Sequence, residues 1–260
     1  VRASFGGRHA STHKGESLDF ADYRPYVVCD DYRRIDHNLY ARLGQLVVRQ
    51  FEAEEELTVK VVVDSSASMG MYAKHQMAVC IAGMVSYLAL AGGDRVSLYS
   101  LPGKDRPLVI GPAGRHLSQW PLLERWLESL SAGGTVPMDG VLRTLVGSSA
   151  NRGATVLVSD LLDPAWERTL DGAGLGAGGL ILHLLAAPEI EPDLVGDLTL
   201  VDVEHGTRTP VSTSEDTVRA YRAALEEFVT SAAGRARRAG LDYLLVPATP
   251  DAPERVLAAL

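Results

Sequence analysis

Oxygen-bearing side chains gather in the segment 61–70, which reads VVVDSSASMG. Asp64, Ser66 and Ser68 alternate along a short turn that directly follows an apolar run typical of a buried strand. Alternate residues of one tight loop can present a carboxylate and two hydroxyls to a single point. These hard oxygen donors suit Mg²⁺, or Mn²⁺ and Ca²⁺, better than metals that prefer cysteine or histidine. Because ligands of open α/β sheets bind beyond the carboxyl ends of strands, the spacing predicts a divalent-cation site.

Two further segments carry oxygen donors that fit the same site. Thr135 follows two glycines in a loop ahead of a predicted helix, and Asp160 follows Ser159 at the end of the strand-like run ATVLVS. Both segments are loops that can meet at one edge of a sheet. The predicted metal ligands are therefore Asp64, Ser66, Ser68, Thr135 and Asp160. A simpler interpretation, in which Asp64 and Ser66 only cap the next helix, leaves Thr135 and Asp160 without a role.

The elements that must position these residues alternate along the chain from residue 57 onward. Short apolar runs typical of doubly buried strands are separated by helical stretches, which predicts an α/β fold with a doubly wound, mostly parallel sheet. The expected strands are residues 57–63, 95–101, 154–159, 180–185, 198–203 and 241–246, and the expected helices are residues 72–91, 117–130, 138–146, 164–170 and 216–238. The most apolar stretch, residues 77–91, is short for a bilayer, so a buried core helix is expected.

Residues 1–56 differ from the rest, since they are rich in Arg, Asp and Tyr. We predict that they form an appended module, and that residues 57–260 form the α/β domain. The arginines of the module could make a binding face or could pair with the interleaved acidic residues. They are Arg24, Arg33, Arg34, Arg42 and Arg49.

Composition excludes several function classes. A formal net charge of −8 and a pI near 5.4 argue against a nucleic-acid partner. Two cysteines, Cys29 and Cys80, cannot form a disulfide framework and have no C-x-x-C spacing, which favours a reducing, cytoplasmic setting. The first residues contain no apolar core, so we expect neither a signal peptide nor a membrane span.

The D-x-S-x-S motif at residues 64–68, the Gly-Thr loop and the strand-terminal Ser-Asp resemble the metal-ion-dependent adhesion site (MIDAS) of von Willebrand factor A domains in type, order and rough spacing. The resemblance implies that Ser66 and Ser68 bind the metal directly. It implies that Thr135 binds directly or through water, and that Asp64 and Asp160 act mainly through water. In such a site an Asp or Glu of a protein partner can complete the coordination.

Motifs ahead of the metal strand resemble the bacterial domain-of-unknown-function 58 family. They are Ser-x-x-x-Gly-Glu at residues 11–16, Phe20, Tyr23-Arg24-Pro25-Tyr26, Asp31-Tyr32-Arg33-Arg34-Ile35-Asp36 and Ala41-Arg42. The chain departs from the usual family residues at Cys29-Asp30-Asp31, His37 and Tyr40. The resemblance covers nearly the whole chain and implies an adaptor for a MoxR-type AAA+ ATPase in chaperone-like assembly or maturation. It would act in the cytoplasm, either free or at the periphery of the membrane.

Two alternatives stay open at this point. Residues 66–70 approximate the nucleophile elbow of a serine hydrolase with Ser68 as nucleophile, and Asp160 and His183 follow in the required order. Against this alternative, Ser66 replaces the first glycine of the elbow, and His183 lies inside a strand-like run. An exported adhesion domain would share the metal site but would need an export signal. With no phosphate-binding loop in the sequence, we expect a binding module without enzymatic activity.

Overall fold

The computed structural model describes residues 10–14, 20–27, 30–54, 58–101, 108–134, 153–171, 178–194, 196–203 and 206–260. Contacts divide the chain into two compact units, one of which is Gly7–Glu56 and the other of which contains Leu57–Leu260. Whether each unit folds as an independent domain stays a prediction.

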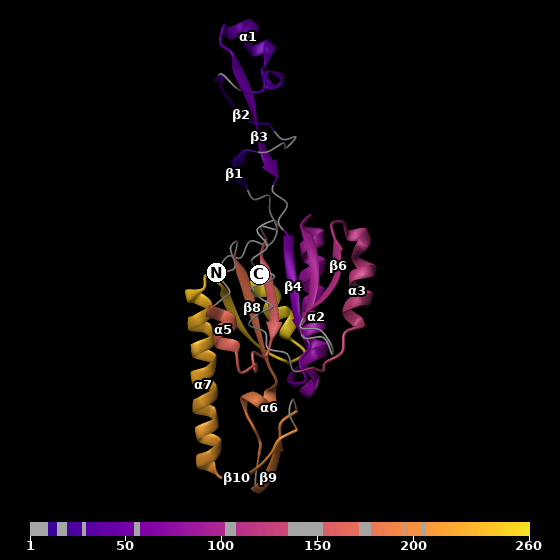
Figure 1. Ribbon diagram of the computed structural model, residues 1–260, viewed down its shortest axis with the longest axis vertical. Helices are drawn as coiled ribbons and strands as arrows, with labels where there is room; N and C mark the ends of the chain where they lie inside the picture. The colour runs from indigo at the N-terminus through magenta and orange to yellow at the C-terminus, as the bar shows by residue number, and fades with distance from the viewer. Residues whose placement is uncertain are drawn as a thin grey trace. The chain divides into compact units, whose positions relative to one another are not determined.

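A six-stranded sheet forms the centre of the larger unit (Figure 1), with the strand order β11-β8-β7-β4-β5-β6. The strands are β4 (Thr58–Asp64), β5 (Arg95–Leu101), β6 (Val109–Gly114), β7 (Thr155–Ser159), β8 (Gly179–Leu185) and β11 (Asp242–Pro247). The edge strand β6 runs antiparallel to β5, and the other neighbouring pairs are parallel. The predicted α/β class with a mostly parallel sheet is confirmed.

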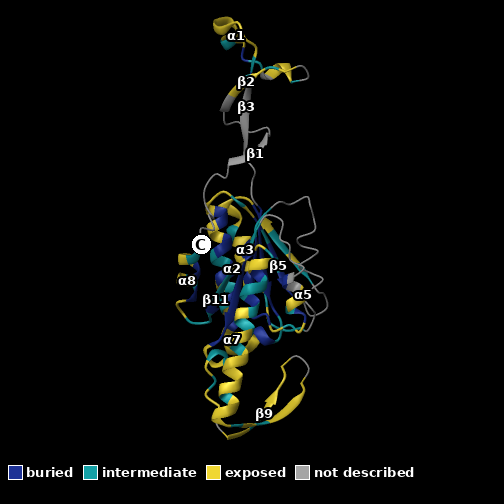
Figure 2. Ribbon diagram, turned by 90° about the vertical axis from the view of Figure 1, so that its left-hand side faces the viewer, coloured by how far each residue is buried: buried dark blue, intermediate teal, exposed yellow. Residues whose placement is uncertain are grey.

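Helices cover both faces of this sheet, which explains why its central strand is apolar without alternation. Every residue of β4 is buried, with Val61 and Val63 in one core cluster and Val62 in the other. Buried residues fill the interior of this unit between its helices (Figure 2). The first cluster lies under α2 (Lys74–Ala91), α3 (Trp120–Glu128) and α8 (Ala252–Ala259); the second lies under α5 (Trp166–Asp171) and α7 (Glu215–Arg238). Burial of each valine contributes about 1.5–3 kcal/mol to folding.

One expected strand lies outside the main sheet. Residues 198–203 overlap β9 (Gly196–Val201), which pairs in antiparallel register with β10 (Arg208–Thr213) as a separate two-stranded sheet. The short helix α6 (Ala187–Ile190) lies between β8 and β9. The prediction that this segment alternates with helices in the parallel sheet was wrong, because a short apolar run does not reveal which strand it pairs with. Most residues of β9 and β10 are exposed.

The most apolar predicted helix lies in the core, as expected. It corresponds to α2, which buries Ile81 and Val85 against the sheet. Within the described ranges, no helix combines the length and apolar character needed to cross a membrane. The helix expected at residues 138–146 lies outside the described residues.

In its described residues, the smaller unit contains a three-stranded antiparallel sheet, a 3-10 turn (Tyr32–Arg34) and a short α-helix. Its elements are β1 (Ala10–Lys14), β2 (Phe20–Pro25), α1 (His37–Leu43) and β3 (Val47–Glu54), with β3 in the middle of the sheet. Asp36 caps α1 by accepting the backbone N–H groups of Asn38 and Leu39, and Gly44, at φ 66°, ends the helix in a left-handed conformation.

Candidate metal centre

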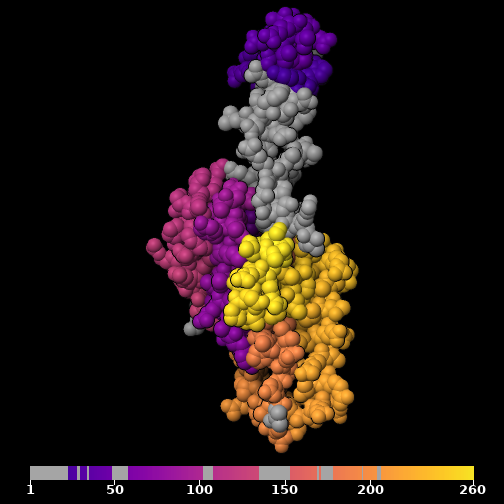
Figure 3. Space-filling view, turned by 180° about the vertical axis from the view of Figure 1, so that it is seen from behind, coloured from indigo at the N-terminus to yellow at the C-terminus, as the bar shows by residue number. Residues whose placement is uncertain are grey.

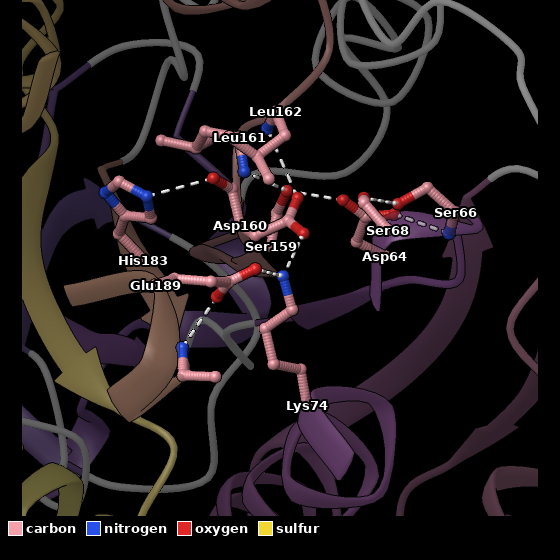
Figure 4. Close-up of polar contacts among 11 residues, drawn as sticks. Asp64, Ser66, Ser68, Lys74, Ser159, Asp160, Leu161, Leu162, His183 and Glu189 are labelled. Carbon is pink, nitrogen blue, oxygen red and sulfur yellow. Dashed lines mark hydrogen bonds and ion pairs between the residues drawn. The ribbon is translucent and has the colours of Figure 1, made fainter. Parts of the chain in front are cut away.

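The loop that follows β4 brings three of the predicted ligands together (Figure 4). Asp64 is 1% exposed; its Oδ1 accepts the Ser66 backbone N–H at 2.8 Å, and its Oδ2 accepts the Ser159 hydroxyl at 2.5 Å. The hydroxyl oxygens of Ser66 and Ser68 lie 3.0 Å apart. The helix-cap interpretation fails, because the N-cap residues of the two helical segments that follow, Ala67 and Ala73, make no side-chain capping bond.

Asp160 reaches the same edge of the sheet from the neighbouring strand. β7 pairs in parallel with β4, with Val158 beside Val63, so the residues that follow the two strands lie close together. Asp160 is 1% exposed, and its Oδ1 accepts the backbone N–H of Leu162 at 3.2 Å. The turn beyond it places Leu161 at φ 55°, a conformation that costs a branched residue energy and occurs where the surrounding structure imposes it.

The predicted Gly-Thr loop approaches the same site through its two glycines. The Gly133 N–H donates to the Ser65 carbonyl at 2.7 Å, and the Ala67 N–H donates to the Gly134 carbonyl at 3.2 Å. Gly134 has a φ of 125°, which side-chain-bearing residues rarely adopt. Thr135 lies outside the described residues. Gly134, which precedes Thr135, is therefore hydrogen-bonded to the loop that contains Asp64. The place of Thr135 in the site stays a prediction.

The electrostatics of the site fit a cation. Burial, followed by the charge of nearby Asp160, raises the pKa of Asp64 to about 7. A divalent ion would favour the ionised form and offset the cost of burying two carboxylates. In the described part of the chain, no group of three or more His, Cys, Asp and Glu residues could hold a metal ion. A cation here would depend on the serine hydroxyls and on water, as a hard ion such as Mg²⁺ does.

Two charged residues of the site escaped the sequence analysis. Lys74, at the start of α2, is fully buried, and its Nζ donates to Asp160 Oδ2 at 2.7 Å and to Glu189 Oε1 at 2.5 Å. Burial alone would lower the pKa of Lys74, but the two carboxylates outweigh burial and raise it. A lysine at a helix start ordinarily indicates an exposed charge, so no sequence signal was available. Tyr72 and Ala73, at φ 54° and 59°, form the turn that leads into this lysine.

His183 forms a hydrogen bond with the backbone of Asp160. Burial lowers the pKa of His183 to about 4, so the ring is neutral near pH 7. Its Nε2 lies 2.9 Å from the Asp160 carbonyl, which can only accept, so Nε2 carries the proton; Nδ1 accepts from the Tyr243 hydroxyl at 2.5 Å. The hydrolase alternative needs this ring beside Ser68, whose hydroxyl is paired with that of Ser66 instead.

The sequence has relatives that place it in a family. The family model described as "Protein of unknown function DUF58" matches residues 22–230, which is most of the chain. The chain belongs to the DUF58 family. It is 30% identical over 207 residues to the uncharacterized protein Rv1480 of Mycobacterium tuberculosis H37Rv and, over the same length, to Mb1516 of Mycobacterium bovis. These matches cover 77% of this chain, and the chain spans only 65% of the length of either relative.

The solved structures with a similar chain path share little sequence with this protein. The BatB protein of Bacteroides thetaiotaomicron is 13% identical with a TM-score of 0.43, and the match covers 77% of this DUF58 chain and 95% of that chain. The SpRpn10 VWA domain is 10% identical with a TM-score of 0.42, covering 79% and 95%. At such scores the likeness says nothing about partners or ligands.

Proposed function

We propose that this DUF58 protein is a non-enzymatic protein-binding module that depends on a divalent cation, Mg²⁺ or else Mn²⁺ or Ca²⁺. A carboxylate of the partner would complete the coordination of the ion. The observation that supports this proposal is the meeting of two loops from neighbouring strands, which gathers buried carboxylates and hydroxyls at one edge of the sheet. The residues that would hold the ion are Asp64, Ser66, Ser68, Thr135 and Asp160.

The charge of the site explains why binding would need the cation. Asp160 and Glu189 share the ammonium of Lys74, and Asp64 lies near Asp160, so the cluster carries a formal charge of −2 when all three carboxylates are ionised. Such a cluster repels an acidic side chain. A divalent ion neutralises this charge. Because few protein oxygens would hold the ion, some of its coordination positions stay available to an Asp or Glu of the partner.

The partner that we propose is a MoxR-type AAA+ ATPase, because the family resemblance implies an adaptor role in assembly or maturation. The sequence contains no G-x-x-x-x-G-K-[ST] segment, so in such a complex the partner would hydrolyse the ATP. The acidic composition, with a net charge of −8, suits a protein partner better than nucleic acid.

A capture experiment tests the cation dependence. The full chain is immobilised and a MoxR-type ATPase is passed over it in Mg²⁺ or in EDTA, using wild type and Asp64→Asn. The substitution keeps the size of the side chain and an oxygen for the Ser66 amide, but it removes the charge. Loss of Mg²⁺ and the substitution should each weaken capture by about tenfold or more, and the two together by little more than either, since both remove one shared contact.

Asp251→Asn is the matched control, because Asp251 is an exposed aspartate that pairs with Arg255. It should bind the ATPase as the wild type does. Undiminished capture by Asp64→Asn, with folding verified by circular dichroism, would refute a metal-gated interface. Capture of the ATPase in EDTA at wild-type strength would do the same.

A further inference from the structure

We infer that Lys74 is a built-in counter-ion of the site, which neutralises Asp160 in the metal-free protein and opposes the entry of a divalent cation. The inference rests on the proposed cation site and deepens it, because it names the residue that limits the affinity for the metal. The state of the site would then depend on a competition between an ammonium that belongs to the protein and an ion from solution.

The burial of Lys74 is the first step of the argument. Its side chain is 0% exposed, and it bridges two carboxylates that lie 86 and 115 residues further along the chain. Removing an ammonium from water costs several kcal/mol unless carboxylates compensate it at short range. A surface lysine would be stabilised by water, whereas buried Lys74 depends on its carboxylate partners. One of these partners is the predicted metal ligand Asp160.

The hydrogen bonds of Asp160 give the second step. Both of its carboxylate oxygens are engaged, with Oδ2 accepting from Lys74 and Oδ1 accepting from the Leu162 N–H. A cation, or the water bound to it, has to share these oxygens with Lys74. Two positive charges that share one carboxylate away from bulk water repel each other strongly, so the ammonium weakens metal binding.

Glu189 supplies the third step, because it gives the ammonium a second anchor. Its Oε2 accepts the Ala186 N–H at 2.7 Å, and its backbone carbonyl accepts the Tyr221 hydroxyl of α7 at 2.7 Å (Figure 4 shows the carboxylate contacts). Glu189 is thus fixed in place and can keep the charge of Lys74 neutralised when Asp160 binds a cation. Without Glu189, the ammonium would depend on Asp160 alone and would compete harder with the metal.

The test measures the Mg²⁺ affinity of the full chain by titration calorimetry for wild type, Lys74→Gln and Glu189→Gln. Lys74→Gln removes the opposing charge and should bind Mg²⁺ about tenfold or more tightly than wild type. Glu189→Gln keeps an oxygen for the Ala186 amide but loses its charge, and should bind Mg²⁺ about tenfold more weakly. Opposite changes from the two members of one ion pair are the expected result, because general damage to the site would weaken both.

Thermal unfolding in EDTA and in Mg²⁺ gives a second measurement. In EDTA, Lys74→Gln should unfold at a lower temperature than wild type, since Asp160 and Glu189 lose their counter-ion. Mg²⁺ should raise its unfolding temperature more than that of wild type. Lys60→Gln is the control, because it removes another buried lysine from the opposite end of β4 and should leave the Mg²⁺ affinity unchanged.

Each outcome decides the inference. Equal or weaker Mg²⁺ binding by Lys74→Gln overturns it, as does a complete lack of Mg²⁺ binding in both proteins, which would also remove the cation site. If Lys74→Gln does not fold, Glu189→Gln decides alone, and unchanged or tighter binding overturns the inference. If Lys74→Gln binds more tightly while capture of the ATPase ignores Mg²⁺, the counter-ion role stands and the proposed function fails.

Discussion

Asp64 and His183 show what burial does to single titratable residues at the edge of the sheet. Burial favours the neutral form of each, so the pKa of Asp64 rises to about 7 and that of His183 falls to about 4. The neutral imidazole then fixes the backbone of Asp160 through one hydrogen bond. The side chains that face the metal position are thus held by residues that would not contact the metal.

His183 makes folding stability depend on pH. The pKa of His183 in the folded protein, about 4, lies below the ordinary value of 6.5. Between these two pH values, the imidazole is protonated in the unfolded chain and neutral in the folded chain. The stabilisation is complete above pH 6.5 and is lost as the pH falls through 4, up to about 3 kcal/mol. His183→Gln keeps a donor for the Asp160 carbonyl and should lose this acid sensitivity, as measured by urea unfolding between pH 4 and 7.5.

The comparison of the two proteins isolates the histidine. Asp64 contributes the opposite slope, because its raised pKa makes the metal-free protein more stable as the pH falls through 7. That contribution is common to wild type and His183→Gln and cancels in the difference. Parallel stability curves for the two proteins across this pH range would contradict the assigned protonation of His183.

At the scale of elements, close packing of β7 against β4 requires one glycine. A Cβ added to Gly153, just before β7, would lie 1.9 Å from the backbone carbonyl oxygen of Thr58 in β4. Strand backbone cannot yield as a flexible side chain can. Gly153→Ala should therefore cost about 3 kcal/mol or more of stability, measured by chemical denaturation.

Gly234, near the C-terminal end of α7, is the matched control. An added Cβ would lie 3.6 Å from an Arg238 nitrogen, which is ordinary contact, and the backbone there is helical. Gly234→Ala should raise stability by about 0.5–1 kcal/mol, because alanine loses less backbone freedom on folding. A Gly153→Ala protein as stable as wild type would show that the two strands do not approach as described.

The β9–β10 hairpin is an exposed part of the larger unit. Figure 3 shows a face of this unit on which α8, in yellow, lies above the β9–β10 hairpin, in orange. Leu200 and Val201 of β9 are 47% and 53% exposed, so this hairpin presents apolar side chains to solvent. A two-stranded sheet is marginally stable by itself, and here Thr217 of α7 donates its hydroxyl to the Ser212 carbonyl of β10.

At the scale of the whole molecule, we predict that the arginines of the smaller unit add an electrostatic contact with the partner. Arg24 is paired with Asp30, as the simpler interpretation of its charges predicts, whereas Arg33 is exposed with its guanidinium 5.9 Å from the Tyr32 ring centre. Arg33→Ala combined with Arg34→Ala should weaken capture of the ATPase by about two- to tenfold at low salt, even in EDTA, and less at high salt.

Arg219→Ala is the control for this prediction, because Arg219 is an exposed arginine on α7 that pairs with Asp216. It should leave capture unchanged. An equal loss of binding by the double variant at low and high salt would contradict an electrostatic role for the arginines of the smaller unit.

Local patterns were sufficient for five of the six strands of the main sheet and for one half of the site. The run that ends at Asp64 is apolar on both faces because helices cover both faces, and the residue types that follow it have few other uses at a strand end. Asp160 could be placed beside it, since residues that end parallel neighbours meet at one edge. The mostly parallel sheet and the gathering of Asp64, Ser66, Ser68 and Asp160 followed from this reasoning.

Tertiary structure decided the remainder, because pairing between distant residues leaves no local trace. β9 contains a short apolar run like that of a core strand, but it pairs in antiparallel register with β10 and lies outside the main sheet. The local sequence around Lys74 and around Glu189 predicts an ordinary solvent-exposed charge at each position. Their contact requires α2 and α6 to converge at one end of the sheet, and the energy that holds an ammonium there comes from carboxylates 86 and 115 residues away.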